Sequence, residues 1–455
     1  MHAASPRASL LPSAREAWRR DHRALFRRLL SAVPVIHVVG AGLAGLAAAV
    51  RLVQRGRPVA LYEAAQQAGG RCRSFFDRTL GRVIDNGNHL LVSGNHSALA
   101  YLDAIGASDG LIGPKDASFP FLDLASGERW VMRPNRGPLP FWVLLPSRRV
   151  PGTRLGAYLA TWRLARADDR HKVADCLRTD DPLWRRFWSP LTTAVLNTPP
   201  KTGSARLLWA ALRESFAQGA AGCRPLIARA SLAASLVDPA LQFLRHHGVQ
   251  VAFGQRLRAV GLQDRRASSL DFGQRPIELG PGDQVILALP PGQATALLPD
   301  LTAPHTCHAI VNGHFRLAKP VSLPGDSVLL GLVGGTAEWL FVRDELVSLT
   351  VSAADALADE PSGTIAARLW ADTAAALGLP TQPQPPARIV KERRATFAQT
   401  PEQVARRPPA VTRWSNLFLA GDWTATGLPA TIEGAIRSGN TAAELAVKQT
   451  ETKTL

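Results

Sequence analysis

The chain has 455 residues, 46% hydrophobic and 20% charged, which excludes wholesale disorder and allows about two or three domains. Its formal charge is +17, and 46 of its 53 basic residues are arginine. Residues 1–34 carry +5 and residues 129–172 carry +8, so the rest is nearly neutral. This distribution indicates one basic face rather than a polyanion-wrapping protein, and we expect no nucleic-acid partner. A coding bias toward arginine explains the excess equally well.

The first informative block lies near the N-terminal end. Residues 35–39 (VIHVV) predict a short buried strand, residues 46–54 a helix, and residues 58–62 a second strand. Gly40, Gly42 and Gly45 lie between the first strand and the helix, and Glu63 follows the second strand.

Each part of this block has a physical task. Gly40 permits a tight turn, Gly42 lets the backbone approach a pyrophosphate, and Gly45 lets the helix lie close to the strand. The helix N-terminus attracts phosphate, and Glu63 can accept hydrogen bonds from a ribose. We therefore predict a dinucleotide site, formed by Gly40, Ala41, Gly42, Leu43, Ala44, Gly45 and Glu63. The alternative is a βαβ unit whose glycines serve packing alone.

A glycine pair, Gly69 and Gly70, leads into Arg71 shortly after the ribose acid. This arrangement resembles the flavoproteins of the amine oxidase and phytoene desaturase superfamily, and the resemblance implies that Arg71 helps to hold FAD. The alternative for Arg71 is a surface salt bridge.

The far end of the chain carries a second pattern of the same superfamily. A strand is predicted over residues 416–420, followed by a turn at Gly421 and Asp422 and a helix over residues 429–446. The resemblance implies that Gly421 and Asp422 bind the ribityl-phosphate region. It also implies that the helix start, at Thr431 and Ile432, faces the pyrimidine end of the flavin, where a helix dipole stabilises negative charge.

Several stretches resemble one branch, the hydroxysqualene dehydroxylases, also called squalene-associated FAD-dependent desaturases. They are residues 85–91 (DNGNHLL), 188–191 (WSPL), 196–200 (LNTPP), 394–397 (RATF) and 420–435 (AGDWTATGLPATIEGA). The resemblance covers about residues 35–447. It implies reduction of hydroxysqualene to squalene with FADH2 as hydride donor and loss of water, as a step of squalene and hopanoid biosynthesis. Asn88, a predicted cofactor contact, stands where this family has Gln, and it keeps the same donor and acceptor set.

We expect an α/β fold with a Rossmann-like FAD domain, built on a central parallel sheet, and an interleaved α+β substrate domain. The FAD domain is predicted from residues 35–100, 225–300 and 388–450, with a helix near 228–247 and strands over 249–253 and 284–289. The substrate domain is predicted from residues 101–224 and 301–387, and residues 1–34 form a basic extension. By resemblance, the backbone of Leu257 contacts the adenine.

For catalysis, His89 is the candidate proton donor for the departing hydroxyl, because its motif is expected near the flavin and imidazole titrates in the useful range. The alternative is that His89 and Asn88 only hydrogen-bond the flavin or a buried backbone group. No metal is expected, since the four cysteines form no CxxC pair.

A C30 isoprenoid substrate is nearly insoluble in water, so its enzyme should meet a membrane. Residues 138–146 (PLPFWVLLP) are apolar and too short to span a bilayer, but basic residues flank them. We predict peripheral contact with an anionic membrane through Arg136, Phe141, Trp142, Arg148 and Arg149. The expected location is the cytoplasm, at the inner face of the cytoplasmic membrane, with possible coupling to squalene-pathway synthases. A buried loop is the alternative for this stretch.

Two other functions remain open. One is a carotenoid-type desaturase or an amine oxidase, in which the flavin runs in the oxidative direction. The other is a non-catalytic protein that binds prenyl lipids on the same fold, against which the Gly421–Asp422 turn and its helix argue.

Overall fold

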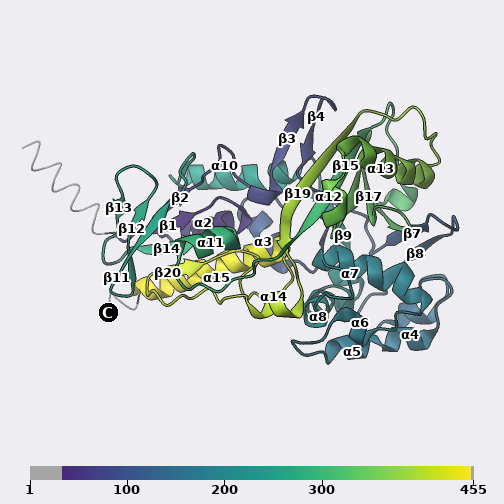
Figure 1. The fold of residues 1–455 in the computed structure, drawn as a ribbon, viewed down its shortest axis with the longest axis horizontal. Coiled ribbons are helices and arrows are strands. Elements are labelled where there is room, and N and C mark those ends of the chain that lie inside the picture. Colours follow the sequence, from purple (N-terminus) through teal and green to yellow (C-terminus); the bar gives the residue numbers. More distant parts are fainter. Residues whose placement is uncertain (1–32, 452–455) are drawn as a thin grey trace, which may run out of the picture.

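A five-stranded parallel sheet forms the core of the first part of the computed structural model, which describes residues 33–451; it lies in the left half of Figure 1. Its strands are short and rich in Val, Ile and Leu. Strands β1 (Ile36–Val39) and β14 (Gln284–Leu287) are buried along their whole length, as is typical of parallel strands covered on both faces. In spatial order they are β10 (Val251–Ala252), β2 (Val59–Tyr62), β1 (Ile36–Val39), β14 (Gln284–Leu287) and β20 (Leu417–Leu419). The predicted α/β class with a central parallel sheet is confirmed.

Helices from distant parts of the chain cover this sheet. On one face, α2 (Leu43–Gln54) packs between α15 (Ile432–Glu451) and α10 (Asp238–His246), which continues from the π-helical turn η5 (Ala233–Val237). The other face carries α11 (Pro291–Leu297) and a small sheet of β11 (Ala259–Gln263), β12 (Arg266–Asp271) and β13 (Ile277–Glu278). The first and last helices of this unit therefore lie side by side although they are nearly 400 residues apart.

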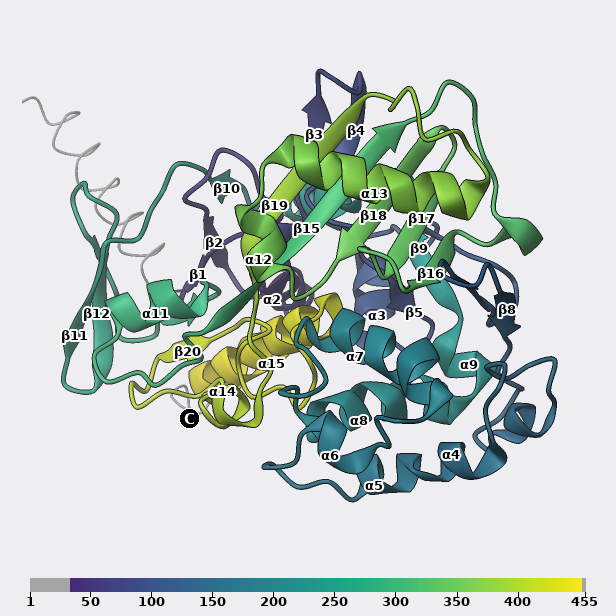
Figure 2. The same ribbon diagram turned by 45° about the vertical axis from the view of Figure 1, so that its right-hand side comes forward.

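A seven-stranded sheet forms the second part of the molecule (Figure 2). Only one neighbouring pair, β16 with β7, is parallel. The order is β19 (Ala387–Phe397), β15 (Cys307–Arg316), β18 (Leu346–Val351), β17 (Trp339–Arg343), β16 (Leu329–Val333), β7 (Phe119–Asp123) and β8 (Arg129–Met132). Helices α12 (Asp355–Asp359) and α13 (Ser362–Leu377) cover one face, and the opposite face of β7, β8, β16 and β17 packs against a helical segment.

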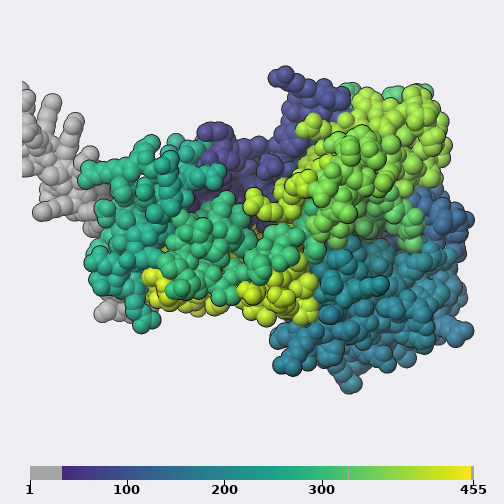
Figure 3. Space-filling model, in the orientation of Figure 1, coloured from purple at the N-terminus to yellow at the C-terminus, as the bar shows by residue number. Residues whose placement is uncertain are grey.

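In the view of Figure 2, a helical segment lies below this sheet. The same segment forms a separate lobe in Figure 3. It comprises η2 (Phe141–Leu144), α4 (Leu155–Leu159), α5 (Thr161–Ala165), α6 (Val173–Cys176), η3 (Trp184–Trp188), α7 (Ser189–Leu196), α8 (Ala205–Glu214), η4 (Phe216–Gln218) and α9 (Ala220–Cys223). Short elements link the parts, namely η1 (Gly70–Cys72), β3 (Ser74–Asp77), β4 (Arg82–Asp85), β5 (Leu91–Val92), α3 (His96–Ala104), β6 (Leu111–Ile112), β9 (Pro225–Ala228), η6 (Pro324–Asp326) and α14 (Pro401–Ala405).

Two boundaries differ from the sequence predictions. The helix expected from Ala228 starts at Ala233, because residues 225–228 instead pair with β5 and β6. Strand β19 falls within the predicted third FAD segment, yet it pairs with β15 in the seven-stranded sheet. The basic extension lies outside the described residues except for its last two.

Candidate active site

The glycine-rich loop joins β1 to α2. Gly40 has a φ of +105°, and a Cβ on Gly45 would overlap the carbonyl oxygen of Gly40. A Cβ on Gly42, in contrast, would meet no atom within 4 Å, so the loop is open on that side. No side chain among residues 33–451 caps the N-terminus of α2, which leaves its first N–H groups for an anion.

Glu63 and the glycine pair, Gly69 and Gly70, surround this loop. Glu63 Oε2 accepts a hydrogen bond of 2.8 Å from the Ala41 N–H. The Gly69 N–H donates to the Ala41 carbonyl oxygen at 2.8 Å, and Gly70 lies against Gly42. Residues predicted separately from two patterns are thus brought together around one open face.

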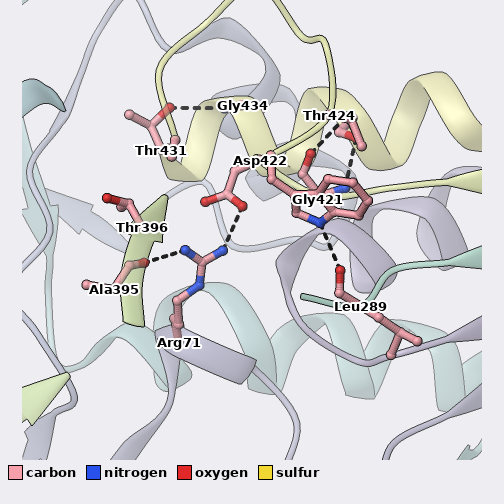
Figure 4. A network of polar contacts seen from close by, with 12 residues as sticks. Arg71, Leu289, Ala395, Thr396, Gly421, Asp422, Thr424, Thr431 and Gly434 are labelled. Atoms are coloured by element: carbon pink, nitrogen blue, oxygen red, sulfur yellow. Dashed lines mark hydrogen bonds and ion pairs between the residues drawn. The ribbon is translucent and has the colours of Figure 1, made fainter. Parts of the chain in front are cut away.

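Arg71 links this cluster to the far end of the chain (Figure 4). Its Nη2 lies 2.7 Å from Asp422 Oδ1, and its Nη1 donates to the Ala395 carbonyl oxygen at 2.5 Å. The Asp422 carboxylate raises the pKa of Arg71, so the guanidinium remains charged. The Asp422 side chain is buried and the Arg71 side chain is 44% exposed, so the pair joins a buried carboxylate to an accessible guanidinium.

The turn at Gly421 is fixed from several sides. Its φ is +149°, and a Cβ there would collide with the Trp423 indole. That indole donates to the Leu289 carbonyl oxygen at 2.8 Å, and the Gly421 N–H donates to Ser438 Oγ at 2.9 Å (Figure 4). Only glycine fits this turn, which explains its place before Asp422.

The start of α15 lies next to this turn. Thr431 Oγ1 accepts a hydrogen bond of 3.1 Å from the Gly434 N–H, so Thr431 caps the helix. Ile432 is the first residue of the helix and is buried. The other N–H groups at the start of α15 and the positive end of its dipole therefore lie at the end of the loop that contains Asp422.

Arg407 is a central residue of this region that the sequence reasoning missed. Its guanidinium is buried and donates to the carbonyl oxygens of Asp422, Thr424 and Leu428 and to Thr426 Oγ1, at 2.8–3.0 Å. Burial lowers the pKa of Arg407 to about 10, which still leaves it charged at neutral pH. It holds the shape of the loop between β20 and α15, but an isolated Arg in a loop gives no sequence signal of this role.

His89 lies after β4 and lines a narrow cavity. The other lining residues combine polar and apolar side chains: Asp85, Asn88, Ile227, Ala228, Leu232, Phe341 and Arg343. Burial lowers the pKa of His89 to about 4, an effect that outweighs the opposing influence of Asp85. The imidazole is therefore neutral at neutral pH, and a catalytic role for His89 stays a prediction.

In the residue 85–89 motif, Asp85 and Asn88 bond to side chains of the seven-stranded sheet and of β3. Asp85 Oδ2 pairs with Arg343 at 2.8 Å, and its Oδ1 accepts from Ser74 Oγ at 2.7 Å. The Asn88 side chain donates to Thr350 Oγ1 at 3.1 Å, and that hydroxyl donates to Asn312 Oδ1 at 2.8 Å. The motif is thus fixed against strands that follow it by more than 200 residues.

Gln399 connects the helical segment to the loop before α15. Its side-chain nitrogen donates to the Leu196 carbonyl oxygen at 2.6 Å, and its Oε1 accepts from the Ala430 N–H at 2.9 Å. Its own N–H donates to Thr198 Oγ1 at 2.8 Å. Two stretches of the family pattern, residues 196–200 and 420–435, therefore meet at one fully buried amide.

Two further predicted residues are placed as follows. Leu257 lies after β10, in a loop whose Gln255 N–H donates to the Glu63 carbonyl oxygen at 2.8 Å, so this loop lies beside the end of β2; its predicted contact with the adenine stays a prediction. Trp142, predicted to contact a membrane, is 8% exposed and packs edge-on against Tyr158. That prediction is wrong for Trp142, because its indole belongs to the core of the helical segment. Phe141, in contrast, is 60% exposed.

Comparison with known proteins decides the family. The model of the flavin-containing amine oxidoreductases matches residues 43–447. The chain belongs to this family.

Within the flavin-containing amine oxidoreductases, this chain is similar to hydroxysqualene dehydroxylases. It is 49% identical to that of Rhodopseudomonas palustris, over 90% of this chain and 97% of the relative, and 48% identical to that of Sinorhizobium fredii, over 92% and 99%. Among solved structures, cyclohexylamine oxidase from Brevibacterium oxydans matches with a TM-score of 0.67 and 16% identity, covering 93% of this chain and all of that chain. This last likeness concerns the fold.

The protein is a flavin-dependent oxidoreductase, and its cofactor is FAD. The described residues fit that cofactor. Gly42 presents an open backbone face, Glu63 a partly exposed carboxylate, and α2 and α15 direct their N-termini toward the same group of loops. Arg71 and Asp422 lie between these features.

Proposed function

We propose that this protein catalyses the reductive dehydroxylation of hydroxysqualene to squalene. The observation that carries the proposal is the similarity to hydroxysqualene dehydroxylases over about nine-tenths of both chains. The lining of the narrow cavity beside His89 agrees with it, because polar side chains lie there together with the apolar Ile227, Leu232 and Phe341.

FAD, when reduced to FADH2, would supply a hydride for the carbon and a proton for the hydroxyl, so that the C–O bond breaks, water leaves and oxidised FAD remains. We propose that the residues 40–45, Gly69 and Gly70 hold the pyrophosphate, with Arg71 as its cation. Glu63 accepts from the ribose, Leu257 contacts the adenine, and Gly421 and Asp422 bind the ribityl-phosphate region. Thr431, Ile432 and Asn88 lie at the flavin end.

His89 is the proposed contact for the departing hydroxyl. As a neutral imidazole, with a pKa of about 4, it orients the hydroxyl through an N–H and does not serve as an imidazolium acid. We therefore expect His89→Gln to keep its FAD and to slow the hydride step about 10²-fold or less, the lower range for such a group. The measurement is stopped-flow flavin reoxidation, with the exposed His96→Gln as matched control. Loss of FAD in the variant would assign His89 to cofactor binding instead.

The reaction itself is tested by anaerobic incubation of the dithionite-reduced protein with hydroxysqualene. Flavin reoxidation together with squalene formation is the expected result. Rapid flavin reduction of the oxidised protein by a polyene, without reoxidation by hydroxysqualene, would assign a desaturase. A purified protein without a flavin spectrum would favour a non-catalytic prenyl-lipid carrier.

We also propose that the protein works at the inner face of the cytoplasmic membrane, because its isoprenoid substrate partitions into lipid. Among residues 33–451, no helix is long and apolar enough to cross a bilayer. Contact through Arg136, Phe141, Arg148 and Arg149 and coupling to squalene-pathway synthases remain predictions.

A further inference from the structure

The helical segment exposes an unusual number of large apolar side chains. Twelve such side chains are exposed among the described residues, and seven of them lie between residues 139 and 162. They are Leu139, Phe141, Leu144, Leu145, Leu155, Leu159 and Trp162, which we call the apolar surface. A soluble monomer rarely gathers exposed apolar residues in this way without a partner for them.

The spacing of these residues directs them outward together. Leu155, Leu159 and Trp162 follow one another at i, i+4 and i+7 along α4 and α5, and Ala160 between the two helices keeps helical dihedrals. Phe141 and Leu144 are three residues apart in the 3-10 helix η2, which also places them on one side.

The two elements are joined on their inner sides. The rings of Trp142 in η2 and Tyr158 in α4 meet edge to face at 5.7 Å, and the Tyr158 hydroxyl accepts from the Val150 N–H at 3.1 Å. Trp142 is therefore buried and Tyr158 half-buried at this contact, while Phe141 and Leu144 of η2 and Leu155 and Leu159 of α4 are exposed. The exposed apolar residues thus lie on two elements that contact each other and on α5, which follows α4 directly.

Positive charge accompanies this surface. No Asp or Glu occurs in residues 130–167. Within residues 33–451, no carboxylate forms an ion pair with Arg136, Arg148, Arg149, Arg154, Arg163 or Arg166. Arg166 instead lies 5.1 Å over the Trp162 ring, and Arg149 donates to the Val143 carbonyl oxygen in η2. An anionic leaflet has an apolar acyl-chain region beneath negatively charged headgroups. The exposed apolar side chains match the first, and the unpaired arginines around them match the second.

We infer that the apolar surface of η2, α4 and α5 docks on an anionic lipid bilayer, with Leu155, Leu159 and Trp162 as a second insertion element beside η2. A second copy of the chain is disfavoured as occupant, because a two-fold interface would bring the same unpaired arginines face to face. This inference depends on the proposed function in one respect, the identity of the substrate that the bilayer would deliver.

Vesicle flotation tests this inference with the full holoenzyme. Vesicles of phosphatidylcholine with phosphatidylglycerol should bind the protein, and pure phosphatidylcholine should bind it at least tenfold more weakly. The variant Leu155→Ser, Leu159→Ser, Trp162→Ser should lose tenfold or more of the binding. Arg154→Gln with Arg163→Gln, which removes two of the six unpaired arginines, should weaken the salt dependence of binding.

The matched control is Phe76→Ser with Arg78→Gln on the β3–β4 hairpin. Phe76 is 62% exposed, and the hairpin lies at the upper edge of the molecule while α4 and α5 lie at the lower edge (Figures 1 and 2). This control should bind like the unchanged protein. Equal flotation of all variants, or none of the unchanged protein, would overturn the inference. A concentration-dependent dimer that the Leu155, Leu159 and Trp162 variant abolishes would assign the surface to a second copy.

Turnover separates this inference from the proposed function. With hydroxysqualene dispersed in detergent, the apolar-surface variant should match the unchanged protein, whereas with vesicle-held substrate its rate should fall. If the unchanged protein fails in detergent, the proposed reaction is wrong, and flotation still decides the docking surface.

Discussion

Arginines in two regions of the molecule serve opposite purposes. Around the cofactor loops, Arg71, Arg343 and Arg407 direct their charge inward, to buried carboxylates or carbonyl oxygens. Along residues 136–166, six arginines have no carboxylate partner among residues 33–451. The net charge of +17 therefore includes arginines that are paired inside the fold and arginines that remain available to a partner. Substitutions in the two regions should differ sharply in their effect on stability.

The largest effect is expected at Asp85. Asp85→Ala leaves the Arg343 guanidinium and the Leu232 N–H without their buried acceptor. We expect a loss of about 4 kcal/mol in the free energy of unfolding, measured by urea denaturation. Asp180→Ala, which removes an exposed carboxylate 3.1 Å from Arg178, is the control and should change little. A loss below about 1 kcal/mol at Asp85 would show that the inward pair is dispensable.

Arg407→Met comes next. It leaves three loop carbonyl oxygens without their donor, so we expect a loss of about 3 kcal/mol together with a lower FAD content after purification. The neighbouring Arg406 is exposed, and Arg406→Met should keep both stability and flavin. Full FAD content in Arg407→Met would mean that the loop keeps its shape without this cation.

A smaller effect is expected from His314, which is buried beside Asp85 and Arg343 and pairs with Ser348 at 2.8 Å. Burial lowers the pKa of His314 to about 4, so between pH 6.5 and 4 the unfolded chain binds a proton that the folded chain does not. Stability is therefore lost as the pH falls through this range, by about 2 kcal/mol from pH 8 to pH 5 for this group. Denaturation curves of His314→Gln should lack this contribution. An unchanged pH dependence would contradict it.

The smallest effect on stability is expected from Arg154→Gln with Arg163→Gln. Both side chains are exposed and lack a carboxylate partner among the described residues, so the free energy of unfolding should change by less than about 0.5 kcal/mol. Thermal unfolding without vesicles checks this. A large destabilisation would show that these arginines also belong to the internally satisfied group.

Much of the cofactor region was predictable because its signals are local. The spacing of Gly40, Gly42 and Gly45 and the turn at Gly421 each depend on backbone geometry that a few adjacent residues determine. The roles of Arg343 and Arg407 were not predictable, because each depends on a partner fixed by tertiary packing; Asp85 and Arg343 are 258 residues apart. Trp142 was misplaced for the same reason, since an apolar run does not reveal which of its aromatics faces inward.

The buried amide of Gln399 has a thermodynamic consequence. It joins the carbonyl oxygen of Leu196, at the end of α7, to the N–H of Ala430, just before α15. A ligand that shifts the Ala430 loop must therefore strain or move the end of α7. If FAD binding shifts this loop, reciprocity requires that a ligand bound against the end of α7 changes the affinity for FAD by the same factor by which FAD changes the affinity for that ligand.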